Sequence, residues 1–144
     1  KLERDLATFH GREAAMTVSS AYGAVLGVLA PLITSETAVI SDSLNHNSII
    51  SAVRMARPRE KYVYGHLDLA DLEARLDEAS QRCRRAIVVT DGVFSMRGDY
   101  APLKEIVKIA ANCDSKFPEN VLIKKKLNRA SIFLKSQFFL NWVP

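Results

Sequence analysis

Short β-branched runs alternate with longer amphipathic segments along most of this chain, and this alternation limits its fold more than any other feature. Strands separated by helices favour a parallel sheet, because each crossover returns the chain to the same end of the sheet. The sequence therefore predicts an α/β fold with a mostly parallel sheet and flanking helices. The expected strands are 14–18, 37–41, 61–64, 86–90 and 121–123, and the expected helices are 2–9, 22–33, 46–56, one capped by Asp68, and 102–112.

Residues suited to a helix N-terminus mark where three of these helices begin. Ser19 and Ser20 precede 22–33, and Asp68 precedes the fourth helix. The side-chain oxygens of such residues accept hydrogen bonds from the first backbone N–H groups of a helix. Pro102 suits the first turn of the last helix. Helical spacing places these side chains in the core: Ile49, Ile50, Val53, Leu69, Leu72, Leu76, Leu103, Ile106, Val107 and Ala110.

The formal charge of +4 belongs to the end of the chain and not to its body. The first 120 residues carry 15 Lys and Arg against 16 Asp and Glu, whereas the last 24 carry five Lys and Arg and no acid. Nucleic-acid binding requires a basic surface on the folded domain, so this function is not expected.

The domain boundary is expected at residue 123. Lys124, Lys125 and Lys126 place charge where a central strand that begins at 121–123 should continue. We therefore expect a partial α/β domain at 1–123 and a divergent basic and aromatic tail at 124–144 outside the fold. A shifted reading frame or a spliced-in end would produce such a tail.

The two cysteines, Cys83 and Cys113, lack the CxxC or CxxH spacing of a metal site. Neither a disulfide framework nor a metal is therefore expected. Isolated thiols suit a reducing compartment. No run of 18 apolar residues is present to span a membrane, and nothing at the start has the pattern of a signal peptide. These features predict a cytoplasmic protein.

Loops that follow predicted strands carry polar residues suited to a ligand, and α/β proteins bind ligands at the carboxyl ends of parallel strands. Residues 19–23 lead into a helix whose free N–H groups suit a phosphate, although an ordinary helix cap has the same pattern. In 42–48, the imidazole of His46 suits stacking on a planar cofactor or acid–base chemistry, and a helix cap or a packing residue is the alternative. His10 and His66 lie in no comparable context and are interpreted as structural.

The third loop, 90–96, follows the most apolar of the expected strands. It places Asp91 and Ser95 at the end of a buried strand, where a carboxylate is costly without a partner or a ligand. A turn that uses Asp-Gly to end the strand is the alternative.

These loops, in this order, resemble the α-oxoamine synthase family of pyridoxal 5′-phosphate (PLP) enzymes. The likeness covers about residues 1–123, and it is specific because three separated motifs agree in order and spacing. Within the family, the glycine C-acetyltransferases, also called 2-amino-3-ketobutyrate CoA ligases, are the most similar group. The segments that carry the likeness are 19–22, 41–46, 48–50, 90–96 with Gly98, 68–76 and 101–103.

The resemblance implies part of the large domain of a fold-type-I PLP-dependent transferase. Such enzymes condense an amino acid with an acyl-CoA and act as homodimers, and the resemblance implies that the amino acid is glycine. The resemblance implies that the backbone at Ala21 and Tyr22 holds the cofactor phosphate. It also implies that His46 is catalytic, stacking on the pyridine ring, and that Ser95 hydrogen-bonds near the phenolic oxygen.

Asn45 and Asp91 are expected to shape the site beside the cofactor or behind it. Family members also use an Asp-x-x-His motif, whose aspartate meets the pyridine nitrogen, and a later Schiff-base lysine. Neither occurs in a matching context here, so the chain is expected to be inactive alone. Arg97 stands where the family usually has an acid, and Gly23 where acetyltransferase-like members often have Asp.

Two alternatives stay open. Within the family, the chain is similar to an 8-amino-7-oxononanoate synthase or a serine palmitoyltransferase, because nothing in it selects the acyl chain. In a different class, it is a non-catalytic interaction fragment whose basic tail binds a membrane surface or an acidic partner. The absence of an amphipathic period in that tail argues against this second alternative.

Overall fold

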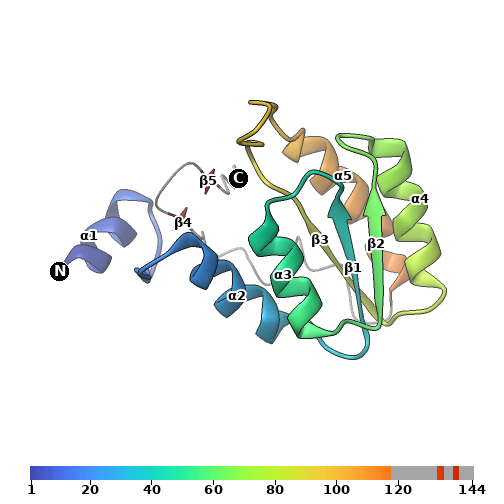
Figure 1. Cartoon of the computed structure of the whole chain (residues 1–144), viewed down its shortest axis with the longest axis horizontal. Helices are drawn as coiled ribbons and strands as arrows, with labels where there is room; N and C mark the ends of the chain where they lie inside the picture. The colour runs from blue at the N-terminus through green and yellow to red at the C-terminus, as the bar shows by residue number, and fades with distance from the viewer. Residues whose placement is uncertain (118–132, 135–137, 140–144) are drawn as a thin grey trace.

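Three parallel strands flanked by helices form the centre of the chain (Figure 1). The structure is a computed structural model that describes residues 1–117, 133–134 and 138–139. The elements in chain order are α1 (Leu2–Phe9), α2 (Ala21–Leu32), β1 (Thr37–Asp42), α3 (Asn47–Ala56), β2 (Glu60–Tyr64), α4 (Leu69–Ser80), β3 (Arg85–Val89), α5 (Leu103–Cys113), the 3-10 helix η1 (Asp114–Lys116), β4 (Phe133–Leu134) and β5 (Phe138–Phe139).

Strand β1 lies between β2 and β3 and pairs with both in parallel. Ile40 lies opposite Tyr62 on one side and Val88 on the other. Ala38, Val39 and Ile40 are 0%, 1% and 0% exposed. A strand buried on both faces has no polar side to alternate with, which explains its continuous apolar run.

Helices cover both faces of the sheet, so the core has two parts (Figure 1). On one face, Ile40 packs in a cluster with Leu72 of α4 and Ile106 of α5. On the other face, Val39 and Ile49 of α3 pack in a second cluster, which α2 also contacts. Successive residues of β1 therefore serve opposite cores, as the two-residue period of a strand requires.

The structure confirms the predicted strands at 37–41, 61–64 and 86–90 and all five predicted helices, with ends that differ by a few residues at most. The helix caps are confirmed as well. Ser20 Oγ accepts the Gly23 N–H at 3.0 Å. Asp68 Oδ1 accepts the N–H groups of Ala70 and Asp71, each at 3.0 Å.

The predicted strand at 14–18 is wrong, because the described structure has irregular backbone there. Met16 is 82% exposed and Val18 is 49% exposed. Glu3 of α1 holds the segment by accepting the Thr17 N–H at 2.8 Å and the Thr17 hydroxyl at 3.0 Å. A short apolar run forms a strand only where another strand pairs with it, and a run of five residues does not reveal whether one will.

One residue of the expected core also lies outside it. Ile49 and Val53 of α3 are 6% and 7% exposed, as predicted, but Ile50 is 43% exposed. A step of one residue turns the side chain by about 100° around a helix, which carries Ile50 off the buried side. On α5, Ile106 is buried, whereas Leu103 and Val107 are only half-buried.

The expected strand at 121–123 lies outside the described residues. So does the tail at 124–144, except for β4 and β5, which pair with each other in antiparallel fashion. The proposed domain boundary and the interaction role of the tail therefore stay predictions. None of the helices in the described ranges is long and apolar enough to span a bilayer.

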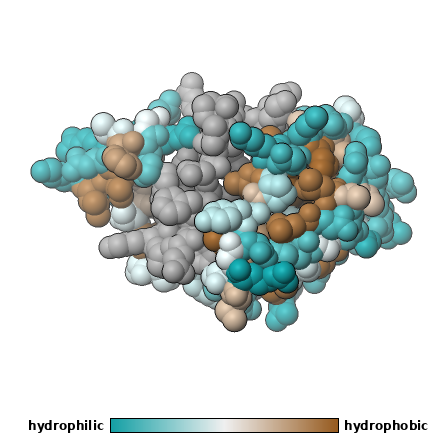
Figure 2. All heavy atoms as spheres, turned by 90° about the horizontal axis from the view of Figure 1, so that it is seen from above, coloured by the Kyte–Doolittle hydropathy of each residue, from teal (hydrophilic) through white to brown (hydrophobic). Residues whose placement is uncertain are grey.

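Apolar side chains are exposed along the N-terminal arm, which we define as residues 1–22. In Figure 2 they show as brown atoms at the left of the view, where Figure 1 places α1. Phe9 is 80% exposed and Leu2 is 63% exposed. Exposed apolar side chains therefore gather at this end of the described chain.

Candidate functional site

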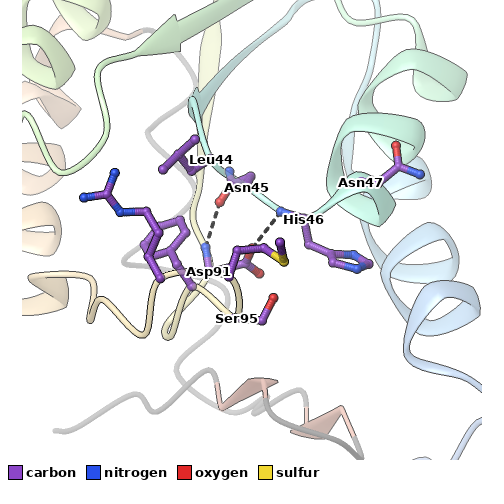
Figure 3. Close-up of a pocket in the computed structure, with 9 residues that line it drawn as sticks. Leu44, Asn45, His46, Asn47, Asp91 and Ser95 are labelled. Carbon is purple, nitrogen blue, oxygen red and sulfur yellow. Dashed lines mark hydrogen bonds between the residues drawn. The ribbon is translucent and has the colours of Figure 1, made fainter.

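A pocket of about 400 Å³ opens at the carboxyl edge of the sheet, between the loop after β1 and the loop after β3 (Figure 3). Its volume falls in the range of small-molecule sites, roughly 300–1,000 Å³. The residues that line it are Leu44, Asn45, His46, Asn47, Asp91, Phe94, Ser95, Met96 and Arg97.

The side chain of Asn45 connects the two loops. Its Nδ2 donates to the carbonyl of Val89 at 2.7 Å and to Ser41 Oγ at 2.9 Å. Its Oδ1 accepts the Asp91 N–H at 2.8 Å. Asn45 is 5% exposed, so these bonds replace the water that its amide loses on folding. The loop after β1 is thereby fixed to the end of β3.

Asp91 completes this connection from the other side. Its Oδ2 accepts the backbone N–H of His46 at 2.7 Å (Figure 3). Burial raises the pKa of the Asp91 carboxyl, and the hydrogen bond from His46 opposes that rise only in part. The hydrogen bond from His46 thus offsets part of the cost of burying the Asp91 carboxylate. It also fixes the His46 backbone at the edge of the pocket.

His46 caps α3 and also borders the pocket. Its Nδ1 lies 2.8 Å from Ser48 Oγ and accepts the Ser48 N–H at 3.1 Å. The cap interpretation of this residue is therefore confirmed. Because Nδ1 acts as an acceptor, the neutral ring carries its proton on Nε2. The side chain remains exposed, and a ring fixed by one edge nitrogen suits a stacking surface.

Ser95 lies on the loop 91–100, and its side chain is exposed at the pocket (Figure 3). The loop closes on itself, since the Phe94 N–H donates to the carbonyl of Asp99 at 2.9 Å and the Gly98 N–H donates to the carbonyl of Phe94 at 2.7 Å. Gly98 has a φ of +76°, a backbone conformation that favours glycine. Ser95 therefore lies on a compact loop that its own backbone hydrogen bonds hold together.

Ala21 and Tyr22 do not line this pocket. They form the first turn of α2, which packs against α3. The first amides of a helix have no acceptor within the helix, and the Ser20 cap engages only the Gly23 N–H. The structure thus brings Asn45, His46, Asp91 and Ser95 together, and it places Ala21 and Tyr22 at the end of the adjacent helix.

The sequence interpretation missed the role of His66 at this edge. Its Nδ1 lies 2.9 Å from Asp42 Oδ1, and its Nε2 lies 3.0 Å from Asp99 Oδ2. Its ring also meets the Phe94 ring edge to face, with centroids 4.4 Å apart. The available signal was position, because His66 follows β2 directly, at the same edge of the sheet where Asp42 ends β1.

The described ranges contain no group of three or more His, Cys, Asp or Glu residues placed to hold a metal ion. Cys83 and Cys113 are buried free thiols. Burial raises the pKa of both thiols, which keeps them protonated and unreactive.

The model of one protein family, aminotransferase class I and II, matches residues 1–119. The chain belongs to the aminotransferase class I and II family. The matched range contains every helix and strand from α1 to η1, which includes the whole three-stranded sheet.

The relatives of this aminotransferase-family chain are α-oxoamine synthases. It is 51% identical over 113 residues to an 8-amino-7-oxononanoate synthase of Exiguobacterium sibiricum, covering 78% of the chain and 28% of that enzyme. It is 52% identical over 110 residues to the mitochondrial 2-amino-3-ketobutyrate coenzyme A ligase of Homo sapiens, covering 76% of the chain and 26% of that enzyme. The chain therefore spans little more than a quarter of the length of these relatives.

Solved structures confirm the fold class. A serine palmitoyltransferase of S. paucimobilis with bound PLP and myriocin matches with a TM-score of 0.71 and 34% identity, over 78% of this chain and 28% of that one. An 8-amino-7-oxononanoate synthase of Francisella tularensis matches with a TM-score of 0.65 and 25% identity, over 83% and 31%. The family member therefore has the fold of one part of a fold-type-I PLP transferase domain.

Proposed function

We propose that residues 1–123 form part of the large domain of a PLP-dependent acyltransferase. The enzyme joins an amino acid to an acyl-CoA, and we assign glycine as that amino acid. The observation that carries the proposal is the pocket that unites His46 and Ser95 from two loops of a chain in this family. Relatives under two enzyme names are almost equally similar, at 51% and 52% identity, so we propose an acyl-CoA substrate without assigning its acyl group.

The residues present fit the cofactor. The His46 ring is fixed through Nδ1 and exposed, so we assign it the stacking surface for the pyridine ring. The exposed Ser95 hydroxyl supplies a donor for the phenolic oxygen. The first amides of α2, at Ala21 and Tyr22, suit the phosphate, because the N-terminus of a helix has free N–H groups and the positive end of the helix dipole. Bound PLP supplies an electron sink for charge that develops at the α-carbon of the amino acid.

Asn45 and Asp91 act as positioning residues in this proposal. Asn45 fixes the loop after β1 to β3, and Asp91 fixes the backbone of His46. The first bond anchors the residue that precedes His46, and the second anchors the His46 backbone itself. We therefore propose that Asn45 and Asp91 orient the His46 ring toward the cofactor.

We further propose that the chain alone does not turn over substrate. Its 144 residues contain no Asp-x-x-His motif, so no aspartate matches the one that meets the pyridine nitrogen in this family. We assign no lysine as the covalent anchor, and we propose that 124–144 lies outside the fold. Weak, reversible PLP binding is the expected property.

A homodimer is the expected assembly of the whole enzyme. The N-terminal arm supports this, because its exposed apolar side chains are costly in water unless another surface covers them. We propose that this arm contributes to the subunit interface.

Equilibrium dialysis of the purified chain against PLP tests the proposed function. Saturable binding is expected, and Ser95→Ala weakens it, whereas Ser115→Ala, at an exposed serine of η1, does not. Equal affinity of both variants would contradict the assignment of Ser95. A lysine adduct that borohydride traps would contradict the expected lack of an anchor.

A proline tests the phosphate contact. Ala21→Pro removes one amide at the first helical position, where proline fits, and Ser20 before it already has the extended backbone that proline requires. We expect Ala21→Pro to weaken PLP binding and to leave pyridoxal binding unchanged, with Ala21→Ser as the matched control that keeps the amide. Equal losses for both ligands would contradict a phosphate contact.

A further inference from the structure

His66 bridges two carboxylates that belong to different parts of the chain. Nδ1 lies 2.9 Å from Oδ1 of Asp42, at the end of β1, and Nε2 lies 3.0 Å from Oδ2 of Asp99, in the loop that carries Ser95. The His66 side chain is 13% exposed, whereas those of Asp42 and Asp99 are 0% and 30% exposed. One partner is therefore fixed in the core and the other is partly open to water.

Both ring nitrogens of His66 face hydrogen-bond acceptors. Both carboxyl oxygens of Asp42 act as acceptors, because Oδ1 also accepts the Leu44 N–H at 2.8 Å and Oδ2 accepts the Leu67 N–H at 3.1 Å. Only the imidazolium form of histidine donates from both nitrogens at once. The geometry thus requires His66 to be protonated when both contacts are made.

The charges around His66 agree with this state. Burial lowers the pKa of His66, but the hydrogen bonds and charges of Asp42 and Asp99 outweigh it, and the pKa is raised. Arg97 also faces Asp99, with Nε 2.7 Å from Oδ2. On the α4 side, Asp71 accepts the Gly65 N–H and pairs with an arginine, and Asp68 caps the helix.

The contacts of His66 reach the loop at two points. Asp99 is one, and the other is Phe94, which is 3% exposed and packs edge to face against the imidazole. When His66 is neutral, one nitrogen presents a lone pair to a carboxylate. Asp42 is held by two backbone amides, whereas Asp99 is the more exposed of the two partners.

We propose that His66 is a positioning residue, which in its protonated form fixes Asp99 and Phe94 to Asp42 and so holds the Ser95 loop against the pocket. The effect on cofactor binding rests on the proposed function, whereas the contact between His66 and the loop does not. Deprotonation of His66 releases the loop and withdraws Ser95 from its place beside His46.

Nuclear magnetic resonance of the full chain tests the contact without any ligand. The ring signals of His66 and the amide signals of Ser95 and Gly98 are followed against pH. We expect one shared midpoint, and Asp99→Asn, at a partly exposed position, moves that midpoint to lower pH. His66→Gln abolishes the pH response of the loop, whereas His10→Gln, at the C-cap of α1, leaves it intact. Loop signals that do not follow the His66 midpoint would overturn the proposal.

PLP dialysis over the same pH range separates this inference from the proposed function. The affinity of the wild type for PLP is expected to fall about fivefold above the His66 midpoint. A change of this size is at the lower end of those caused by coupling between two sites. His66→Gln removes that fall. A pH-independent affinity in the wild type would overturn the link between His66 and the site. No PLP binding at any pH would overturn the proposed function and leave the loop result to decide the His66 contact. If His66→Gln does not fold, Asp99→Asn decides alone.

Discussion

At the scale of single residues, the main chain of the opposite loop fixes two polar side chains of the pocket, Asn45 and Asp91. Asn45 and Asp91 exchange bonds with one another's loops, and His46 uses Nδ1 on the first turn of α3. Buried polar groups with partners restrict motion, since each alternative position leaves a donor or acceptor unsatisfied. The site is therefore preorganised in the described part of the chain.

Two substitutions at His46 separate its cap from its stacking surface. Asparagine is a good N-cap and keeps the acceptor for the Ser48 N–H, whereas alanine removes it at a cost of about 0.5–2 kcal/mol in the free energy of unfolding. We expect His46→Asn to retain wild-type stability in urea unfolding and His46→Ala to lose it. Both weaken PLP binding equally, because both lack the ring. Wild-type PLP affinity in His46→Asn would refute the stacking role.

Asp91 gives a pH-dependent prediction. Its folded pKa is raised, chiefly by burial, so the folded state binds the proton more tightly than the unfolded state does. Stability therefore falls as pH rises from the ordinary aspartate pKa through the raised one. Asp91→Asn keeps an acceptor for the His46 N–H without the charge. We expect the variant to be more stable than wild type at neutral pH, with a gap that closes in acid.

Urea unfolding at several pH values measures this gap. Asp5→Asn, at an exposed position on α1, is the control and should show no such closure. A gap that widens on acidification would mean that the Asp91 carboxylate is stabilised in the fold, contrary to the prediction.

At the scale of elements, the candidate site depends on where strands end and helices begin. The pocket lies between the loops after β1 and β3, and His66 follows β2. Parallel pairing brings all three carboxyl ends to one edge, which places these loops side by side. Helix caps then fix how the chain leaves each loop.

The cap of α4 is a test at this scale. Asp68 accepts two backbone N–H groups at 3.0 Å, so Asp68→Ala should lower the free energy of unfolding by about 1 kcal/mol. Asp68→Ser keeps an acceptor at the same position and should recover most of the loss. Chemical denaturation measures both, and equal losses in the two variants would show that the cap bonds contribute nothing.

At the scale of the whole molecule, the chain buries a core on each face of a three-stranded sheet. The cluster under α4 and α5 contains Leu72 and Leu76, both 0% exposed. The total stability of a domain is about 5–15 kcal/mol, so one large side chain in such a cluster accounts for a sizeable part of it.

Leu76→Ala tests that dependence. Removal of a fully buried leucine side chain costs about 2–5 kcal/mol, from lost burial and the cavity that remains. We expect Leu76→Ala to lose most of its cooperative unfolding transition in urea. Leu2→Ala, at a position 63% exposed, is the matched control and should unfold like wild type. Similar losses in both variants would contradict the assignment of the core.

The sequence alone was enough to predict the elements whose signals are local. The apolar runs at 37–41 and 86–90, the helical spacing of Leu72 and Leu76, and the cap at Asp68 all depend on neighbours within a few residues. The same local order placed His46 and Ser95 in loops at the carboxyl ends of strands, where parallel pairing then brought them together.

The tertiary structure decided what depends on distant partners. Residues 14–18 have the composition of a strand but no strand beside them in the described structure, and α1 holds them through Glu3 instead. His66 meets residues 24 and 33 positions away, Asp42 and Asp99, which no local period relates to it. Periodicity records how a residue sits on its own element, whereas pairing and burial follow from which elements meet, and only the assembled fold specifies that.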